Sequence, residues 1–166
     1  EWDVLFVVDF PLFERDDKGQ LTYVHQPFVA PLEEDIPLLE TNPEAVRGTH
    51  YDVVMNGTEL GSGSLRNHRA DIQRQILRVI GYSEEEMDQS FGFMLDALEL
   101  GAPPHGGFAF GLDRMVMVLA GADSLRDVVA FPKTQRGQDL LMEAPSPVAL
   151  GQLDELSIRV REPKSE

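Results

Sequence analysis

Cysteine is absent from this 166-residue chain, which excludes disulfide bonds and thiolate metal sites. Basic side chains are scarce: 14 Lys and Arg stand against 29 Asp and Glu, a net charge of -15. That balance argues against a main nucleic-acid surface on this chain. Long hydrophobic runs are also missing, since runs such as 115–122 are far shorter than the roughly 20 residues of a membrane-spanning helix. We therefore expect a cytoplasmic protein without membrane contact.

The remaining composition is that of a globular protein, with 42% hydrophobic and 26% charged residues. Strand-like and helix-like segments alternate without a regular βαβ rhythm, which predicts an α+β fold with a mainly antiparallel sheet flanked by helices. The expected strands cover 4–9, 21–25, 51–55, the segment after Gly57, and 127–131. The expected helices cover 70–80, 83–100 and 113–120, the last of them buried, and Ser83 and Glu86 predict a capping box at the start of the second.

A hairpin is predicted at Asn56-Gly57, because Asn-Gly between apolar runs favours a two-residue turn. This register pairs Val54 with Glu59 and leaves Asp52 diagonal to Glu59 on the same face. Two neighbouring carboxylates could hold Mg²⁺, which takes one or two carboxylates together with substrate phosphates. Two solvated strand carboxylates are an equally acceptable interpretation. We expect the glycine-serine run 61–64 to bend or bulge the second strand.

The most informative segment is Gly106–Arg114, which reads as a strand that runs directly into a helix. Because side chains alternate along a strand, one face carries only small residues: Gly107, Ala109 and Gly111. The other face is large and apolar, fit for a core: Phe108, Phe110 and Leu112. A flat ligand could lie on the bare face, with the Arg114 guanidinium stacking on it or pairing with a phosphate. Close packing or a bulge would explain the small residues equally well.

The run Gly107–Arg114 resembles motif 3 of the class II aminoacyl-tRNA synthetases. The longer run Leu95–Gly107 narrows the resemblance to the aspartate, asparagine and lysine subgroup. Within it the chain is most similar to bacterial-type aspartyl-tRNA synthetases, from Val8–Pro11 through to Ala144–Val148. The resemblance implies a class II catalytic core, whose sheet is antiparallel and flanked by helices.

The resemblance also implies how ATP is bound. Arg114 would be the catalytic arginine, stacked on adenine and reaching the γ-phosphate. Asp52 and Glu59 would hold Mg²⁺ against the phosphates. The full set of implied ATP-binding residues is Glu59, Gly111, Leu112, Asp113 and Arg114.

Two further residues would bind the substrate aspartate. Arg66 closes the run Thr58–Arg66, which matches the family segment whose arginine binds the carboxylate, and a guanidinium fork suits that group. His25 precedes Gln26 where the family normally has a second histidine. The departure leaves His25 in place but alters its hydrogen-bonding neighbourhood.

The implied activity is that of an aspartate–tRNA ligase. Residues 1–166 would be the C-terminal portion of its catalytic domain, with motifs 1 and 2, an insertion domain and an anticodon-binding domain outside this chain. The implied ligands are ATP, Mg²⁺, L-aspartate and tRNA-Asp, with tRNA-Asn as a further possibility, and the implied assembly is a homodimer. We expect the isolated chain to be inactive.

Three other functions remain open from the sequence. An asparaginyl enzyme would use the same scaffold, although His25 and Arg66 favour an anionic substrate. A non-catalytic paralogue could bind nucleotide or a partner protein. An unrelated metal-binding module would explain Asp52 and Glu59 but not the motif 3 strand.

Overall fold

The computed structural model describes residues 2–161 of the chain. They fall into two compact units, Glu1–Met115 and Val116–Glu166. The first unit contains the sheet and every residue for which the sequence suggests a role in binding.

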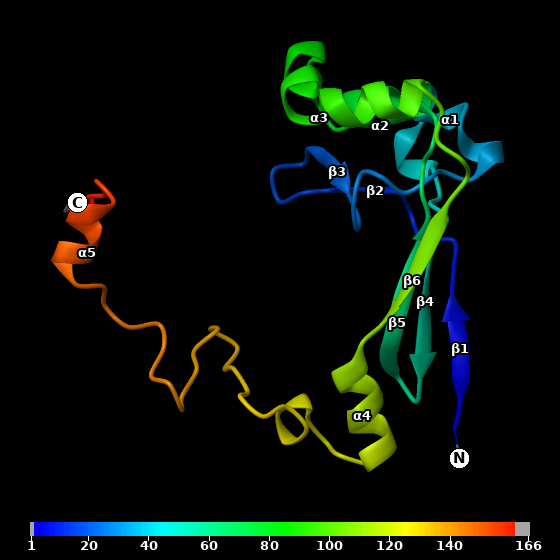
Figure 1. Ribbon diagram of the computed structural model, residues 1–166. Coiled ribbons are helices and arrows are strands. Elements are labelled where there is room, and N and C mark those ends of the chain that lie inside the picture. Colours follow the sequence, from blue (N-terminus) through cyan, green and yellow to red (C-terminus); the bar gives the residue numbers. More distant parts are fainter. Residues whose placement is uncertain (1, 162–166) are drawn as a thin grey trace. The chain divides into compact units, whose positions relative to one another are not determined.

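A four-stranded antiparallel sheet is the centre of the first unit (Figure 1). Its strands are β1 (Val4–Val7), β4 (His50–Met55), β5 (Thr58–Leu65) and β6 (Gly106–Phe110), in that spatial order. The predicted antiparallel α+β architecture is confirmed. Strands β1 and β6 form the two edges of this sheet.

The β4–β5 hairpin turns at Asn56-Gly57, as predicted. Asn56 and Gly57 have positive φ values of 49° and 78°, as a type I′ hairpin turn requires at both central residues. Val54 pairs with Glu59 in the expected register, but Val53 then pairs with Gly61. Leu60 is therefore the extra residue of a bulge, and the prediction of a bulge within residues 61–64 is wrong. The bulge moves Ser62 opposite Asp52.

Three helices gather at one end of the sheet (Figure 1). They are α1 (Leu38–Thr41), α2 (Ala70–Val79) and α3 (Glu84–Glu99), and α3 begins with the predicted capping box of Ser83 and Glu86. Leu77, Met87 and Leu95 form one apolar cluster between α2 and α3. The larger cluster joins α1 and α2 to the small hairpin of β2 (Phe13–Arg15) and β3 (Leu21–Tyr23); its buried members are Leu12, Phe13, Val29, Leu39, Val46, Ile72 and Ile76.

The core therefore lies beside the sheet, and one sequence prediction about it is wrong. Phe108, Phe110 and Leu112, expected to face a core, are 37%, 60% and 71% exposed. Among the described residues of the first unit, the helices pack on one another and on the β2–β3 hairpin, so none of them lies against this face of β6. A periodic pattern shows which residues share a face but not whether a partner covers that face.

Two predictions beyond β6 also need correction. Helix α4 (Leu112–Ala120) forms where expected, but none of its residues is buried. Residues 127–131 are not a strand: Leu125–Asp127 form a 3₁₀ turn, and turns and bends follow. An apolar run becomes a strand only when another strand completes its hydrogen bonds, and no other strand pairs with it among the described residues. The second unit also contains α5 (Leu150–Glu155).

An ion pair fixes the loop that leads into β4. Asp35, 6% exposed, accepts hydrogen bonds from the backbone N–H of Arg47 (3.0 Å) and from its guanidinium Nε (2.8 Å) and Nη2 (3.1 Å). The side-chain hydrogen bonds of Arg47 lower the pKa of the Asp35 carboxyl below its usual 3.8. The backbone carbonyl of Arg47 in turn accepts a hydrogen bond from the N–H of Leu32, so the pair joins two loops beside the sheet.

We predict that Asp35→Asn lowers the free energy of unfolding at pH 7. A carboxyl whose pKa is depressed by folding stabilises the protein above its unfolded pKa, and that contribution disappears as the pH falls through the lower folded pKa. The difference between variant and wild type should therefore shrink below pH 3.8. Denaturant titrations across pH measure it. Glu34→Gln is the matched control, because Glu34 binds the same guanidinium at 2.6 Å from a side chain that is 72% exposed. Equal losses in the two variants would contradict the prediction.

Candidate functional site

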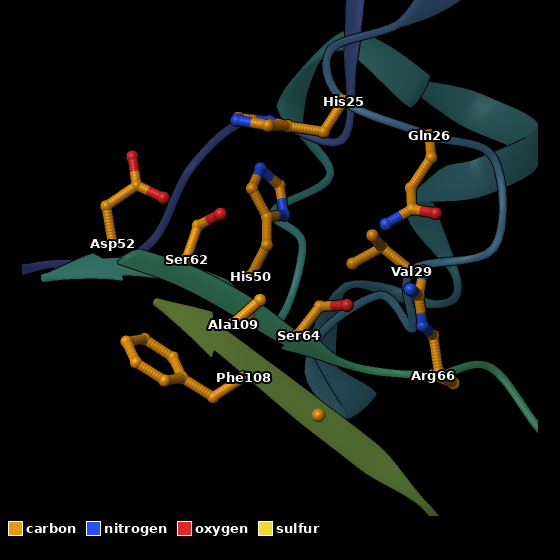
Figure 2. Close-up of a pocket in the computed structure, with 12 residues that line it drawn as sticks. His25, Gln26, Val29, His50, Asp52, Ser62, Ser64, Arg66, Phe108 and Ala109 are labelled. Atoms are coloured by element: carbon orange, nitrogen blue, oxygen red, sulfur yellow. The ribbon is translucent and has the colours of Figure 1, made fainter. Parts of the chain in front are cut away.

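A pocket of about 410 Å³ opens on one face of the sheet (Figure 2). Residues from β4, β5 and β6 and from the loop after β3 line it: His25, Gln26, Val29, His50, Asp52, Ser62, Gly63, Ser64, Arg66, Gly107, Phe108 and Ala109. All of them belong to the first unit. The site is thus a feature of one compact body.

The floor of this pocket follows from strand alternation. Cross-strand pairing brings three rows together, each from one strand: His50 and Asp52, Ser62 and Ser64, Gly107 and Ala109. Across the sheet, β4 contributes ionisable side chains, β5 contributes hydroxyl groups, and β6 contributes little more than backbone. The small-residue face of β6 noted in the sequence therefore forms one side of the pocket floor.

Glycines in β5 allow β6 to approach closely. A Cβ atom at Gly63 would lie 2.3 Å from the carbonyl oxygen of Gly107, and one at Gly61 would lie 2.6 Å from that of Ala109. On the opposite face the Tyr51 and Phe108 rings stack at 5.8 Å with 2° between their planes. The Gly63 Cβ position is also only 2.9 Å from the Tyr51 ring. Any side chain at Gly63 would push the two strands apart.

We predict that Gly63→Ala destabilises the protein by about 1–3 kcal/mol, because the added methyl group would clash with backbone that cannot move away easily. Gly107→Ala is the matched control: a Cβ there meets nothing within 4 Å. Urea unfolding of both variants measures the difference. Similar stability of the two would show that β5 and β6 are not held at this spacing.

Arg66 and His25, the expected aspartate-binding residues, both line the pocket (Figure 2). The backbone N–H of Arg66 donates to the His105 carbonyl at 2.9 Å, which fixes the start of its side chain. Its Nη1 is buried and has no hydrogen-bond partner within the described part of the chain. A buried guanidinium N–H without a partner is costly, and a ligand carboxylate would satisfy it.

Asp52 and Glu59, the expected metal ligands, lie on the same face of the hairpin. Burial raises the pKa of the Asp52 carboxyl, the negative charge of Glu59 raises it further, and His25 partly offsets both. Asp52 lines the pocket, while Glu59 is outside its lining. No group of three or more metal-ligating side chains occurs among residues 2–161. A carboxylate pair nonetheless fits Mg²⁺, whose other ligands are commonly phosphate oxygens and water.

Arg114 reaches back from α4 to Glu59. Its Nη1 donates to the Glu59 backbone carbonyl at 3.0 Å and lies 3.2 Å from the carboxylate Oε2. The Arg114 side chain is 42% exposed, so part of it stays accessible to a ligand, and a guanidinium can stack on an aromatic ring. The expected metal ligand and the expected ATP-stacking residue are therefore directly joined.

The other expected ATP-binding residues surround this junction and do not line the pocket. The Gly111 N–H donates to the Leu60 carbonyl at 2.7 Å, which ties the end of β6 to the bulge of β5. Leu112 and Asp113 are exposed in the first turn of α4.

The structure adds one residue to which sequence reasoning gave no role. His50 lines the pocket and is 6% exposed. Its ring stacks on Phe10 at 4.8 Å and meets the His25 ring edge-on at 4.7 Å. Burial, and then the neighbouring His25, lower the pKa of His50 to about 4. Strand alternation was the signal that could have found it, because His50 is two residues before Asp52 and so shares its face.

Comparison with known protein families shows to which family the chain belongs. Residues 1–135 match the family described as tRNA synthetases class II (D, K and N). The chain belongs to this family. The match includes all four strands of the sheet, every residue that lines the pocket, and Arg114.

Solved structures share the fold of this synthetase chain. An aspartyl-tRNA synthetase from Entamoeba histolytica matches 82% of the chain with a TM-score of 0.59 and 20% identity. An asparaginyl-tRNA synthetase from the same organism, in complex with asparaginyl-adenylate, matches 82% with a TM-score of 0.59 and 20% identity. The asparaginyl-tRNA synthetase of Pyrococcus horikoshii matches 80%, with a TM-score of 0.57 and 21% identity.

These matches cover only part of each solved structure. The synthetase chain spans 24%, 26% and 26% of the length of the three proteins, respectively. Both aspartyl and asparaginyl enzymes are among them, so the fold alone does not distinguish the two amino acids. Among the described residues, no helix combines the length and apolar character that a bilayer crossing requires.

Proposed function

We propose that this chain is the C-terminal part of the catalytic domain of a bacterial-type aspartate–tRNA ligase. Family membership supports the synthetase assignment, and the span of 24% of a solved synthetase supports the view that the chain is one part of a larger enzyme. The bacterial type and the C-terminal position rest on the sequence resemblance alone. The single observation that carries the choice of aspartate is the buried, unpartnered Nη1 of Arg66 in the pocket. An anionic side chain satisfies that donor and its charge, whereas a neutral carboxamide leaves the charge uncompensated.

In this proposal the amino acid lies over the pocket floor, with its side-chain carboxylate held by Arg66 and His25. ATP lies toward the junction of Glu59 and Arg114, where the partly exposed guanidinium can stack on adenine. Asp52 and Glu59 would hold Mg²⁺, which would neutralise phosphate charge when bound. The close carboxylates of the hairpin are the observation that fits this ion.

The proposed reaction needs no covalent enzyme intermediate. An oxygen of the aspartate α-carboxylate attacks the α-phosphorus of ATP, and the bond to the leaving pyrophosphate breaks. A ribose hydroxyl of the terminal adenosine of tRNA then attacks the activated carbonyl carbon, and AMP leaves. The chain's residues contribute by orienting the two substrates and neutralising charge.

The proposal extends to partners. The net charge of -15 implies that most phosphate contacts with tRNA-Asp, or with tRNA-Asn, come from other parts of the protein. Homodimer formation and a cytoplasmic location belong to the same proposal. We also expect no adenylation by the isolated chain, since the resemblance implies that motifs 1 and 2 belong to other parts of the full-length protein.

We predict that aspartate drives ATP–pyrophosphate exchange by the longest natural polypeptide containing this chain, and that asparagine drives it poorly. Arg66→Ala should lower kcat/KM for aspartate at least about 30-fold, because removing one partner of a buried charge pair costs roughly 2 kcal/mol or more. Arg69→Ala is the control, since Arg69 forms exposed ion pairs with Asp71 and Glu33.

Two outcomes would contradict the proposal in different ways. Exchange driven better by asparagine would make the protein an asparaginyl enzyme. A protein that binds Mg-ATP but exchanges with no amino acid would be a non-catalytic paralogue.

A further inference from the structure

His50 has no role in the function proposed so far, yet it occupies the middle of the pocket. Figure 2 shows its ring rising from β4 beside Ser62, with the His25 ring above it. The residue is 6% exposed, and both ring nitrogens, Nδ1 and Nε2, lack a hydrogen-bond partner among the described residues. Buried polar groups are nearly always paired, so two unpaired nitrogens on one ring call for a specific cause.

The structure makes room for this ring. A Cβ atom at Gly48 would lie 2.4 Å from Nδ1 and 2.6 Å from Cε1 of His50, so only glycine leaves the ring its place. Phe10 stacks against one face of the ring at 4.8 Å, and His25 contacts it edge-on. These contacts fix the direction in which the nitrogens point. The arrangement is a fixed imidazole with unused hydrogen-bonding capacity in a ligand-sized pocket.

A second unused donor lies in the same pocket. Nη1 of Arg66 is likewise buried without a partner among the described residues, and Arg66 lines the same pocket as His50. Figure 2 shows its guanidinium pointing toward Gln26, beside Val29. Leaving a buried polar group unsatisfied destabilises the folded protein. A single ligand that accepts a hydrogen bond from each of the two side chains would explain why both are left unsatisfied.

We propose that His50 is an amino-acid-binding residue of this site, donating a ring N–H to the side-chain carboxylate that Arg66 also holds. The inference rests on the proposed function, because it assumes that an acidic amino acid occupies the pocket. It adds a specificity contact that lies on the sheet itself, whereas His25 belongs to a loop. A rigid strand residue holds its donor in a more constant position than a loop residue does.

The test is His50→Phe in the longest natural polypeptide that contains this chain. Phenylalanine keeps an aromatic ring to stack on Phe10 and removes both nitrogens. We expect KM for aspartate in ATP–pyrophosphate exchange to rise about 10-fold or more, as for a lost hydrogen bond to a charged group, with KM for ATP unchanged. The ligand-free unfolding midpoint should stay the same or rise, because unpaired buried nitrogens have been replaced by an apolar ring.

A histidine with a purely structural role would not give this combination of weaker aspartate binding and undiminished stability. His50→Gln, which restores an N–H donor, should bring KM for aspartate part of the way back to the wild-type value. His50→Leu, which also lacks both ring nitrogens, takes the place of the phenylalanine variant if that variant does not fold. His68→Phe is the control, since His68 is outside the pocket lining and should leave both quantities unchanged.

The outcomes separate this inference from the proposed function. A folded His50→Phe protein with the wild-type KM for aspartate overturns the role of His50 alone. So does a folded His50→Leu protein, which also lacks both ring nitrogens, with the wild-type KM when the phenylalanine variant is unfolded and the wild type is active. Wild-type protein that exchanges with no amino acid overturns both the proposed function and the inference built on it.

Discussion

The pairing of β5 with β6 through glycine is the constraint on which the site depends. Gly61 and Gly63 let the two backbones approach at a distance that any Cβ atom would prevent. That approach places the bare face of β6 beside the hydroxyls of Ser62 and Ser64, and the hydrogen bond from Gly111 to Leu60 fixes the residue that precedes α4. Arg114 reaches Glu59 only because the strand ahead of it is held this closely.

The polar end of the pocket depends on a second set of contacts. Asp35 binds Arg47, and the next residue, Gly48, donates its N–H to the Phe10 carbonyl at 2.8 Å. Gly48 also leaves the space that the His50 ring fills. An ion pair between the buried Asp35 and the partly exposed Arg47, both outside the pocket lining, thus helps to position a pocket side chain. Such a pair supports geometry more than it supports stability, since desolvation offsets much of its attraction.

Local patterns predicted much of this molecule from the sequence. The Asn56-Gly57 turn set the hairpin register, the capping box began α3 at the right residue, and alternation identified the bare face of β6. Each of these depends on neighbours within a few residues. The bulge at Leu60 and the exposure of Phe110 could not be predicted, because they depend on β6 and on the presence or absence of a covering element, both remote in sequence.

The candidate site divides in the same way. His25, Asp52 and Arg66 were identified from motifs and do line the pocket, but the motif gave no indication of the ion pair between Glu59 and Arg114. His50 was overlooked because an isolated histidine carries no signal until its burial and its missing partners are known. Burial and hydrogen-bond satisfaction are properties of the folded chain, so no pattern of residue types contains them.

The strand order has a consequence for how the pocket comes into being. The β4–β5 hairpin closes over a two-residue turn, whereas β6 joins β5 only after some 40 residues that include α2 and α3. Local contacts form faster than remote ones, because closing a long loop costs more entropy before any contact compensates for it. The ionisable half of the floor should therefore assemble early and the bare half late. Until the last strand arrives, a nascent chain would display the carboxylates with nothing beside them on which a base could lie.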